Sequence, residues 1–211
     1  KGITIGYSKV LGNNSLLHQY QTLDFLGIMA ANAGIAGVGL YWSGSGQNLA
    51  YRREDFDAIG GFERAKSQIS GDDMYLVQAI SNMQSGALNI DPNSFVYTQP
   101  VETIKQFVNQ RIRWSSNSRT SLNQRPLFFL FILSAFFTNT FILVSVILGI
   151  PGWGFPLLMK FIFEGGVIYF GGRLFETPVN PFVYFAWALA QPLYIPVVGL
   201  MGTLNRFTWK S

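Results

Sequence analysis

The feature that most restricts the fold is the run from Leu127 to Ile150, which has twenty-four residues and no charged side chain. A helix needs about 20 apolar residues to cross the hydrocarbon core of a bilayer, so this run predicts a transmembrane helix. A second run, Pro181 to Met201, has the same character, although Pro192 and Pro196 are expected to distort it. The C-terminal part of the chain is therefore predicted to be helical and membrane-embedded.

A third apolar segment, 155–170, carries Lys160 and Glu164. These residues are four apart, so on a helix they can pair on one face. Two alternatives stay open for this segment. It lies in the membrane plane or re-enters, or it is a true span whose charged pair is buried against a neighbouring helix. Residues 127–203 are thus predicted to form a transmembrane region of two to three segments.

Charge divides the chain into two parts. Residues 1–126 contain eleven Lys/Arg and nine Asp/Glu, whereas residues 127–211 contain four and two. The first part is therefore predicted to be a soluble domain, opening with a strand-like stretch at 3–5. The chain has no Cys, which excludes disulfides, thiolate metal sites and Cys nucleophiles. Its net charge of +4 is small, and no basic run is interleaved with aromatic residues, so nucleic acid is not an expected partner.

The stretch 25–42 is apolar but rich in Gly and Ala, and only Asn32 interrupts it. We interpret it as a buried or membrane-surface helix. If it spanned, residues 1–20 and the polar loop from Ser43 would lie on opposite sides of the membrane, and one folded domain could not contain both.

Two acidic residues, Asp72 and Asp73, begin a predicted helix that runs to about Gln84. Carboxylates at this position commonly cap a helix and interact with its dipole, worth about 0.5–2 kcal/mol. The functional alternative is a general base, because transfer of a sugar to an alcohol requires removal of the hydroxyl proton. The pair alone does not decide between the two.

Gln110, Arg113 and Trp114 stand at i, i+3 and i+4, which share one face of a helix. Arg binds a diphosphate through paired hydrogen bonds, and an indole ring can stack on the apolar face of a sugar. The alternative is that Trp114 packs in the core or at the bilayer surface while Arg113 belongs to a basic flank. Composition alone favours that alternative.

The order of the motifs resolves both questions. A glycine-rich turn comes first, then Asp72-Asp73 with Leu76 three residues on, then Gln110 to Trp114, and then the membrane segments. This order resembles the membrane-bound, processive-type family 2 glycosyltransferases. Asp72 to Leu76 looks like their Glu-Asp-x-x-Leu element, with Asp in place of Glu, and Gln110 to Trp114 matches their Gln-x-x-Arg-Trp motif. Near the end of the chain, Trp209-Lys210 is similar to a Trp-Lys ending of bacterial members.

The resemblance implies an inverting transfer from a nucleotide-activated sugar by a GT-A domain, which is an α/β fold. Asp73 would be the catalytic base, and Asp72 a second acidic residue whose role stays open. Arg113 would bind the donor diphosphate, and Trp114, assisted by Gln110, would shape the acceptor site. The turn at Gly46, Gln47 and Asn48 would line the acceptor side.

The resemblance also implies a divalent cation, Mg or Mn, held by an Asp-x-Asp. Asp55-Phe56-Asp57 has that spelling but falls within a short helix, and we interpret it as solvated helix surface. The metal ligands and the nucleotide-binding half are expected before residue 1, so this chain would be an incomplete fragment of the active enzyme.

Four regions are predicted. Residues 1–115 form the C-terminal part of the GT-A domain, 116–126 a basic interfacial connector, 127–203 the transmembrane region and 204–211 a basic aromatic tail. The basic residues before the first span place the catalytic domain in the cytoplasm by the positive-inside rule, at a cell inner (plasma) membrane.

The expected partners are a nucleotide-sugar donor, a glycan or lipid-linked acceptor and membrane lipid. Two alternatives remain: a lipid glycosyltransferase that adds a single sugar, and a membrane transporter subunit, suggested by ionisable residues within an apolar segment.

Overall fold

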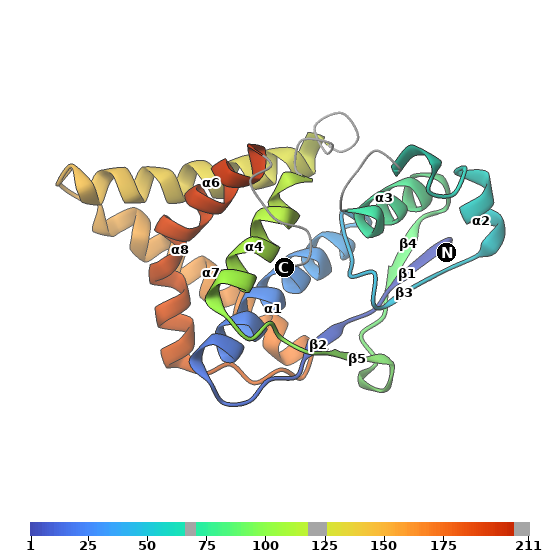
Figure 1. Ribbon diagram of the computed structural model, residues 1–211, viewed down its shortest axis with the longest axis horizontal. Helices are drawn as coiled ribbons and strands as arrows, with labels where there is room; N and C mark the ends of the chain where they lie inside the picture. The colour runs from blue at the N-terminus through green and yellow to red at the C-terminus, as the bar shows by residue number, and fades with distance from the viewer. Residues whose placement is uncertain (66–70, 118–125, 205–211) are drawn as a thin grey trace.

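The computed structural model describes residues 1–65, 71–117 and 126–204. Small β-sheets with two covering helices form one end, three long apolar helices form the other, and helices α1 and α4 lie between them (Figure 1). The predicted connector falls largely on residues 118–125 and the predicted tail on 205–211, both outside the described residues.

Five short strands form two sheets. In the first, the central strand β1 (Ile3–Ile5) pairs antiparallel with β3 (Leu49–Tyr51) and parallel with β4 (Gly86–Leu88). In the second, β2 (Ser8–Val10) pairs parallel with β5 (Val96–Thr98). The predicted strand at 3–5 is confirmed. The combination of strands and helices in this part of the chain is consistent with an α/β domain. These strands alone do not define a GT-A fold.

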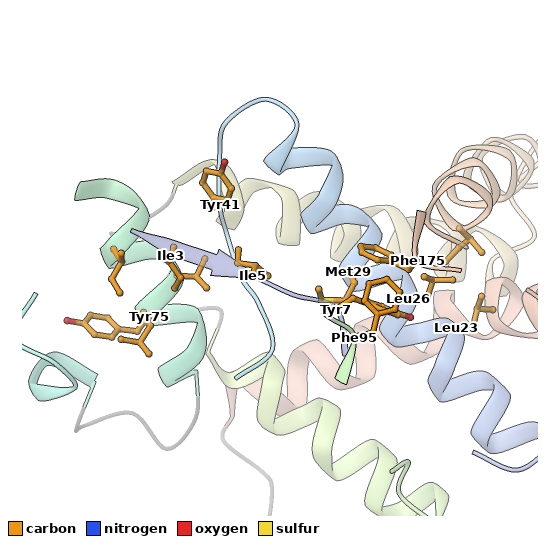
Figure 2. Close-up of a cluster of buried hydrophobic side chains, with 14 of the residues drawn as sticks. Ile3, Ile5, Tyr7, Leu23, Leu26, Met29, Tyr41, Tyr75, Phe95 and Phe175 are labelled. Atoms are coloured by element: carbon orange, nitrogen blue, oxygen red, sulfur yellow. The ribbon is translucent and has the colours of Figure 1, made fainter. Parts of the chain in front are cut away.

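One hydrophobic core extends from the first sheet to the helices. Ile3 and Ile5 are buried beside helix α3 (Asp72–Gln84), and Tyr7 stacks on Phe175 with ring centres 4.2 Å apart (Figure 2). Helix α2 (Arg53–Ala58) covers the same end, and two short 3₁₀ turns, η1 (Glu63–Ala65) and η2 (Pro92–Ser94), complete it. Tyr7 and Phe175 thereby join the first part of the chain to the apolar helices.

Helix α1 (Leu16–Ala36) begins nine residues before the apolar stretch that predicted it. The Ser15 hydroxyl accepts a hydrogen bond from the His18 amide and caps the helix, which explains the early start. The helix packs against two of the long apolar helices, α7 and α8, and it is not among the helices of the described residues that are long and apolar enough to cross a membrane.

Helix α4 (Ile104–Ser116) carries the Gln-x-x-Arg-Trp motif. A capping box starts it: the Thr103 hydroxyl accepts from the Gln106 amide, and the Gln106 side chain accepts from the Thr103 amide. This cap fixes where the helix begins and therefore which way the motif side chains face.

Three helices within the described ranges are long and apolar enough to cross a membrane: α6 (Pro126–Ile147), α7 (Gly154–Leu174) and α8 (Pro181–Thr203). The predicted pair in α7 is present, because the Lys160 Nζ donates to Glu164 at 2.5 Å. Lys160 also contacts Gln191 of α8 at 3.3 Å. Lys160 is thus buried against a neighbouring helix, while Glu164 is partly exposed.

Both ends of α8 touch the first part of the chain. At its start, Asn180 donates to Gln19 at 3.1 Å. At its end, Gly202 lies so close to α4 that a Cβ there would be 2.6 Å from the Ser115 hydroxyl. Just before α8, the Lys9 ammonium donates to the Glu176 carbonyl at 2.7 Å. Helix α8 therefore lies along α4 and is the most buried of the three apolar helices.

Candidate functional site

A glycine allows helix α3, which carries the two acids, to approach helix α4, which carries the Gln-x-x-Arg-Trp motif. Gly71, directly before α3, has φ +90°, and a Cβ there would lie 2.8 Å from the side chain of Asn117 at the end of α4. Only glycine adopts this left-handed backbone readily and leaves room for such an approach. The start of α3, with Asp72 and Asp73, is thereby held beside the last turn of α4.

Asp73 is partly buried and held by backbone donors on both oxygens. The Gly46 amide donates to Oδ2 at 3.2 Å, and the Met74 amide donates to Oδ1 at 2.7 Å. Burial nevertheless raises the pKa of Asp73, although these hydrogen bonds oppose the shift, and the nearby Asp72 charge raises it further. Asp73 is thus a more basic carboxylate than an exposed aspartate.

Arg113 lies within electrostatic reach of both acids. Burial lowers the pKa of the Arg113 guanidinium, while the charges of Asp73 and Asp72 raise it. Asp72 itself is exposed at the helix start. The Arg113 guanidinium of α4 and the Asp72 and Asp73 carboxylates of α3 therefore lie close enough to interact electrostatically.

The predicted acceptor turn contacts these charged residues through Gly46, which is exposed and donates to Asp73. Gln47 is also exposed, and its amide donates to the Thr98 hydroxyl at 2.8 Å. Asn48 has a different setting, because its amide donates to the backbone carbonyls of Tyr7 and Ser94, both at 2.9 Å. Asn48 thus secures the junction of the two sheets.

Gln110 and Trp114 are both partly buried and share contacts with one neighbour that the sequence pattern did not single out. The Arg111 guanidinium donates to the Gln110 carbonyl oxygen at 2.8 Å and lies 4.0 Å from the centre of the Trp114 ring. Trp114 also contacts Phe25 of α1, with ring centres 6.3 Å apart. The Gln110 oxygen and one face of the Trp114 indole are therefore engaged by Arg111.

Arg111 is in turn held by a buried carboxylate. Its Nε donates to Asp24 of α1 at 2.6 Å, and Asp24 also accepts from the Trp187 indole of α8 at 3.2 Å. A sequence signal for this contact exists. Asp24 is the one acidic residue of an otherwise uncharged helix α1, and a charge inside packed helices requires a partner.

The carboxylates of the Asp-x-Asp sequence, Asp55 and Asp57, are both paired with arginines. Asp55 is 3% exposed and accepts from Arg52 at 2.7 Å, while Asp57 accepts from Arg53 at 3.0 Å. Interpreting both residues as solvated surface was therefore wrong for Asp55, which is a buried ion-pair partner. Both carboxylates are neutralised by arginines, and no group of three or more candidate metal ligands occurs within residues 1–65, 71–117 and 126–204.

Comparison with protein families gives one match. The model of glycosyl transferase family 21 matches residues 11–209, which include the turn at 46–48, both acids, the motif helix and all three apolar helices. A search of curated proteins found no matching relative.

Proposed function

Because the chain belongs to glycosyl transferase family 21, we propose that its full-length protein transfers a sugar from a nucleotide-activated donor to a polysaccharide or lipid-linked acceptor, with inversion, and that Asp73 is the catalytic base. The observation that carries the proposal is the convergence at Asp73. Its carboxylate accepts from Gly46 of the predicted acceptor turn and interacts electrostatically with Arg113 of the motif helix. Three segments far apart in the sequence therefore come within interaction range of one carboxylate. The family match supports sugar transfer in general; the processive family 2 subtype and the GT-A fold belong to the proposal.

In the proposed reaction, the acceptor hydroxyl oxygen attacks the anomeric carbon of the donor, and the bond from that carbon to the diphosphate breaks. Asp73 takes the hydroxyl proton, for which the pKa raised by burial suits it. Arg113 binds the departing diphosphate, whose negative charge increases as the bond breaks. Attack from the face opposite the leaving group inverts the anomeric carbon.

Trp114 and Gln110 would bind the acceptor. Arg111 covers one face of the Trp114 ring, so an acceptor sugar would stack on the opposite face. The Gln110 oxygen accepts from Arg111, which leaves its amide N–H groups to donate to a sugar hydroxyl. Gln47, exposed on the turn, would contact the acceptor from the other side.

A second candidate is transfer of a single sugar to a membrane lipid. It is favoured by the position of the motif helix, because α4 lies along the apolar helix α8 and Gly202 approaches Ser115 just past Trp114. An acceptor anchored in the bilayer could reach such a site without leaving the membrane. The transporter alternative has less support, because Lys160 and Glu164 pair with each other and the chain belongs to a glycosyltransferase family.

Part of the donor would be bound by residues outside this sequence. The described Asp-x-Asp carboxylates are paired with arginines and do not fit a metal, so a divalent cation, if used, would be held elsewhere in the full-length protein. The catalytic part is proposed to face the cytoplasm, where nucleotide sugars are made. The apolar helices indicate a membrane protein, and the inner (plasma) membrane is the proposed location.

The test uses the purified full-length enzyme with a panel of radiolabelled nucleotide sugars. The acceptors are a lipid extract and a glycan fraction of the source membranes. Asp73→Asn should reduce transfer about 10²–10⁴-fold. The matched control is Asp57→Asn, which neutralises an exposed, arginine-paired carboxylate outside the site and should retain normal transfer. In the same assay Arg113→Lys should be strongly impaired, because an ammonium cannot reproduce the two-point contact of a guanidinium. Near-normal transfer by Asp73→Asn would refute the assignment of the base.

A further inference from the structure

We propose that Asp24 is a positioning residue for the acceptor site: through its ion pair with Arg111 it fixes Trp114 and Gln110 in the orientation in which they bind the acceptor. This inference rests on the proposed function. It assigns a role to two residues, Asp24 and Arg111, that the motif itself does not identify.

The contacts form a continuous path. Asp24 is 7% and Arg111 6% exposed, and their side chains meet at 2.6 Å. From Arg111 the path divides, with one branch to the Gln110 oxygen at 2.8 Å and the other to the Trp114 ring at 4.0 Å. The guanidinium also lies 4.7 Å from the Phe107 ring centre, so two aromatic rings of α4 enclose it. Arg111 also interacts with the Tyr194 side chain of α8. The residues that Arg111 contacts on this path are therefore Asp24, side chains of the motif helix and one residue of α8.

The physical reason is the planarity of the guanidinium. Its N–H donors lie in one plane, so an ion pair at Nε sets the tilt of the whole group. Asp24 is itself held by the Trp187 indole at 3.2 Å, which leaves it little freedom to move. The Arg111 guanidinium stacks on Trp114 and donates to Gln110. Its orientation is thus set by residues of helices α1 and α8.

The pair also has a cost that favours a functional explanation. Burying two charges is expensive, and well-packed apolar residues in their place are often at least as stable. A pair kept only for stability has no need to contact the motif, whereas this one touches Gln110 and Trp114 directly. Orienting these two side chains is what the pair adds.

The experiment compares Asp24→Asn and Asp24→Glu in the full-length enzyme. Asp24→Asn preserves shape and can still accept from Trp187, but it removes the charge that orients Arg111. We expect the half-saturating concentration of the acceptor fraction to rise roughly tenfold, since a small misplacement of a binding group has large kinetic effects. The KM of the donor should stay within about twofold, because Arg113 is not displaced. Asp24→Glu, which keeps the charge, should recover part of the loss.

The matched control is Asp55→Asn. It also removes a buried carboxylate from an arginine pair, but that pair lies in α2 and does not touch the motif helix. Its acceptor and donor constants should equal those of the wild type. A purely structural role for Asp24 would reduce the active fraction in Asp24→Asn and leave both constants unchanged.

A readout independent of activity is the fluorine NMR signal of Trp114 in protein labelled with 5-fluorotryptophan, assigned by its loss in Trp114→Phe. Asp24→Asn should shift or broaden this signal, and Asp55→Asn should not. If Asp24→Asn does not fold, Arg111→Lys replaces it, because lysine keeps the charge pair but cannot stack as a plane.

An unchanged Trp114 signal together with an unchanged acceptor constant in a folded variant would overturn the inference. Absence of transfer by the wild-type enzyme in every assay would instead count against the proposed function, while the NMR comparison would still test the positioning by Asp24.

Discussion

Gly71→Ala tests whether the close approach of α3 and α4 builds the site. The substitution has two separable costs. Gly71 has φ +90°, and a left-handed backbone costs a residue with a Cβ about 1–2 kcal/mol. In addition, the new Cβ would lie 2.8 Å from the Asn117 side chain, which is too close, so one of the two helix ends must move.

The chain offers a matched control in Gly60→Ala. Gly60 has φ +79° and no atom within 4 Å of the position that a Cβ would take. It therefore carries the backbone cost without the crowding. A loss of about 1–2 kcal/mol corresponds to roughly 2–8 °C in the unfolding midpoint for a domain of about 200 residues. Gly60→Ala should show this loss and retain full transfer activity.

Gly71→Ala should lose more stability than Gly60→Ala and should also lose activity. Both can be measured by tryptophan fluorescence during heating and by transfer kinetics on the folded protein. Adding Asn117→Ala to Gly71→Ala should return part of the activity by making room, but not the backbone cost. Equal activity in Gly60→Ala and Gly71→Ala would refute the idea that contact at Gly71 sets the distance between Asp73 and Arg113.

Two further predictions concern charge and topology. The pKa of Asp73 is raised, so transfer should fall on the acidic side at a higher pH than an ordinary aspartate would give; Asp72→Asn removes a neighbouring negative charge, lowers that pKa, and should move the acidic limb of the kcat/KM profile to lower pH. An unmoved limb would show that Asp73 is not the titrating base. Helix α8 touches the first part of the chain near both of its ends, and that part is expected to face the cytoplasm, so a cysteine at Leu204 should react with a membrane-impermeant reagent from the cytoplasmic face. Labelling only from the outer face would show that α6, α7 and α8 all cross.

The apolar helices were predictable because hydropathy is a local property. The predicted spans from Leu127 and Pro181 coincide with α6 and α8 to within three residues at each end. The start of α3 at Asp72 was likewise predicted correctly, because two acids in the first turn of a helix are a local signal. In each case the residues that decide the boundary lie next to it.

The contacts that build the site were not predictable from local pattern. Asp24 and Arg111 are 87 residues apart, and the sequence around either residue does not indicate the other as its partner. The prediction for 25–42 placed helix α1 too late, because it followed the apolar run and not the cap at Ser15. The partner of Asp55, Arg52, is only three residues away, but the burial of Asp55 depends on the distant Gly2, beside which its carboxylate lies, and this contact has no local signal.

Helix α8 shows why hydropathy and packing answer different questions. Its composition suits a membrane span, yet it lies along α4 and supplies the Trp187 indole that holds Asp24. An apolar surface is satisfied equally by lipid and by protein, because neither offers it water. The polar contacts are more selective. Asn180 with Gln19 and Trp187 with Asp24 fix α8 to α1, the helix whose Asp24 holds Arg111 beneath the motif. If the site works as proposed, α8 therefore acts as scaffold of the acceptor site, and substitutions on the face that bears Trp187 should affect catalysis more than substitutions on its exposed face.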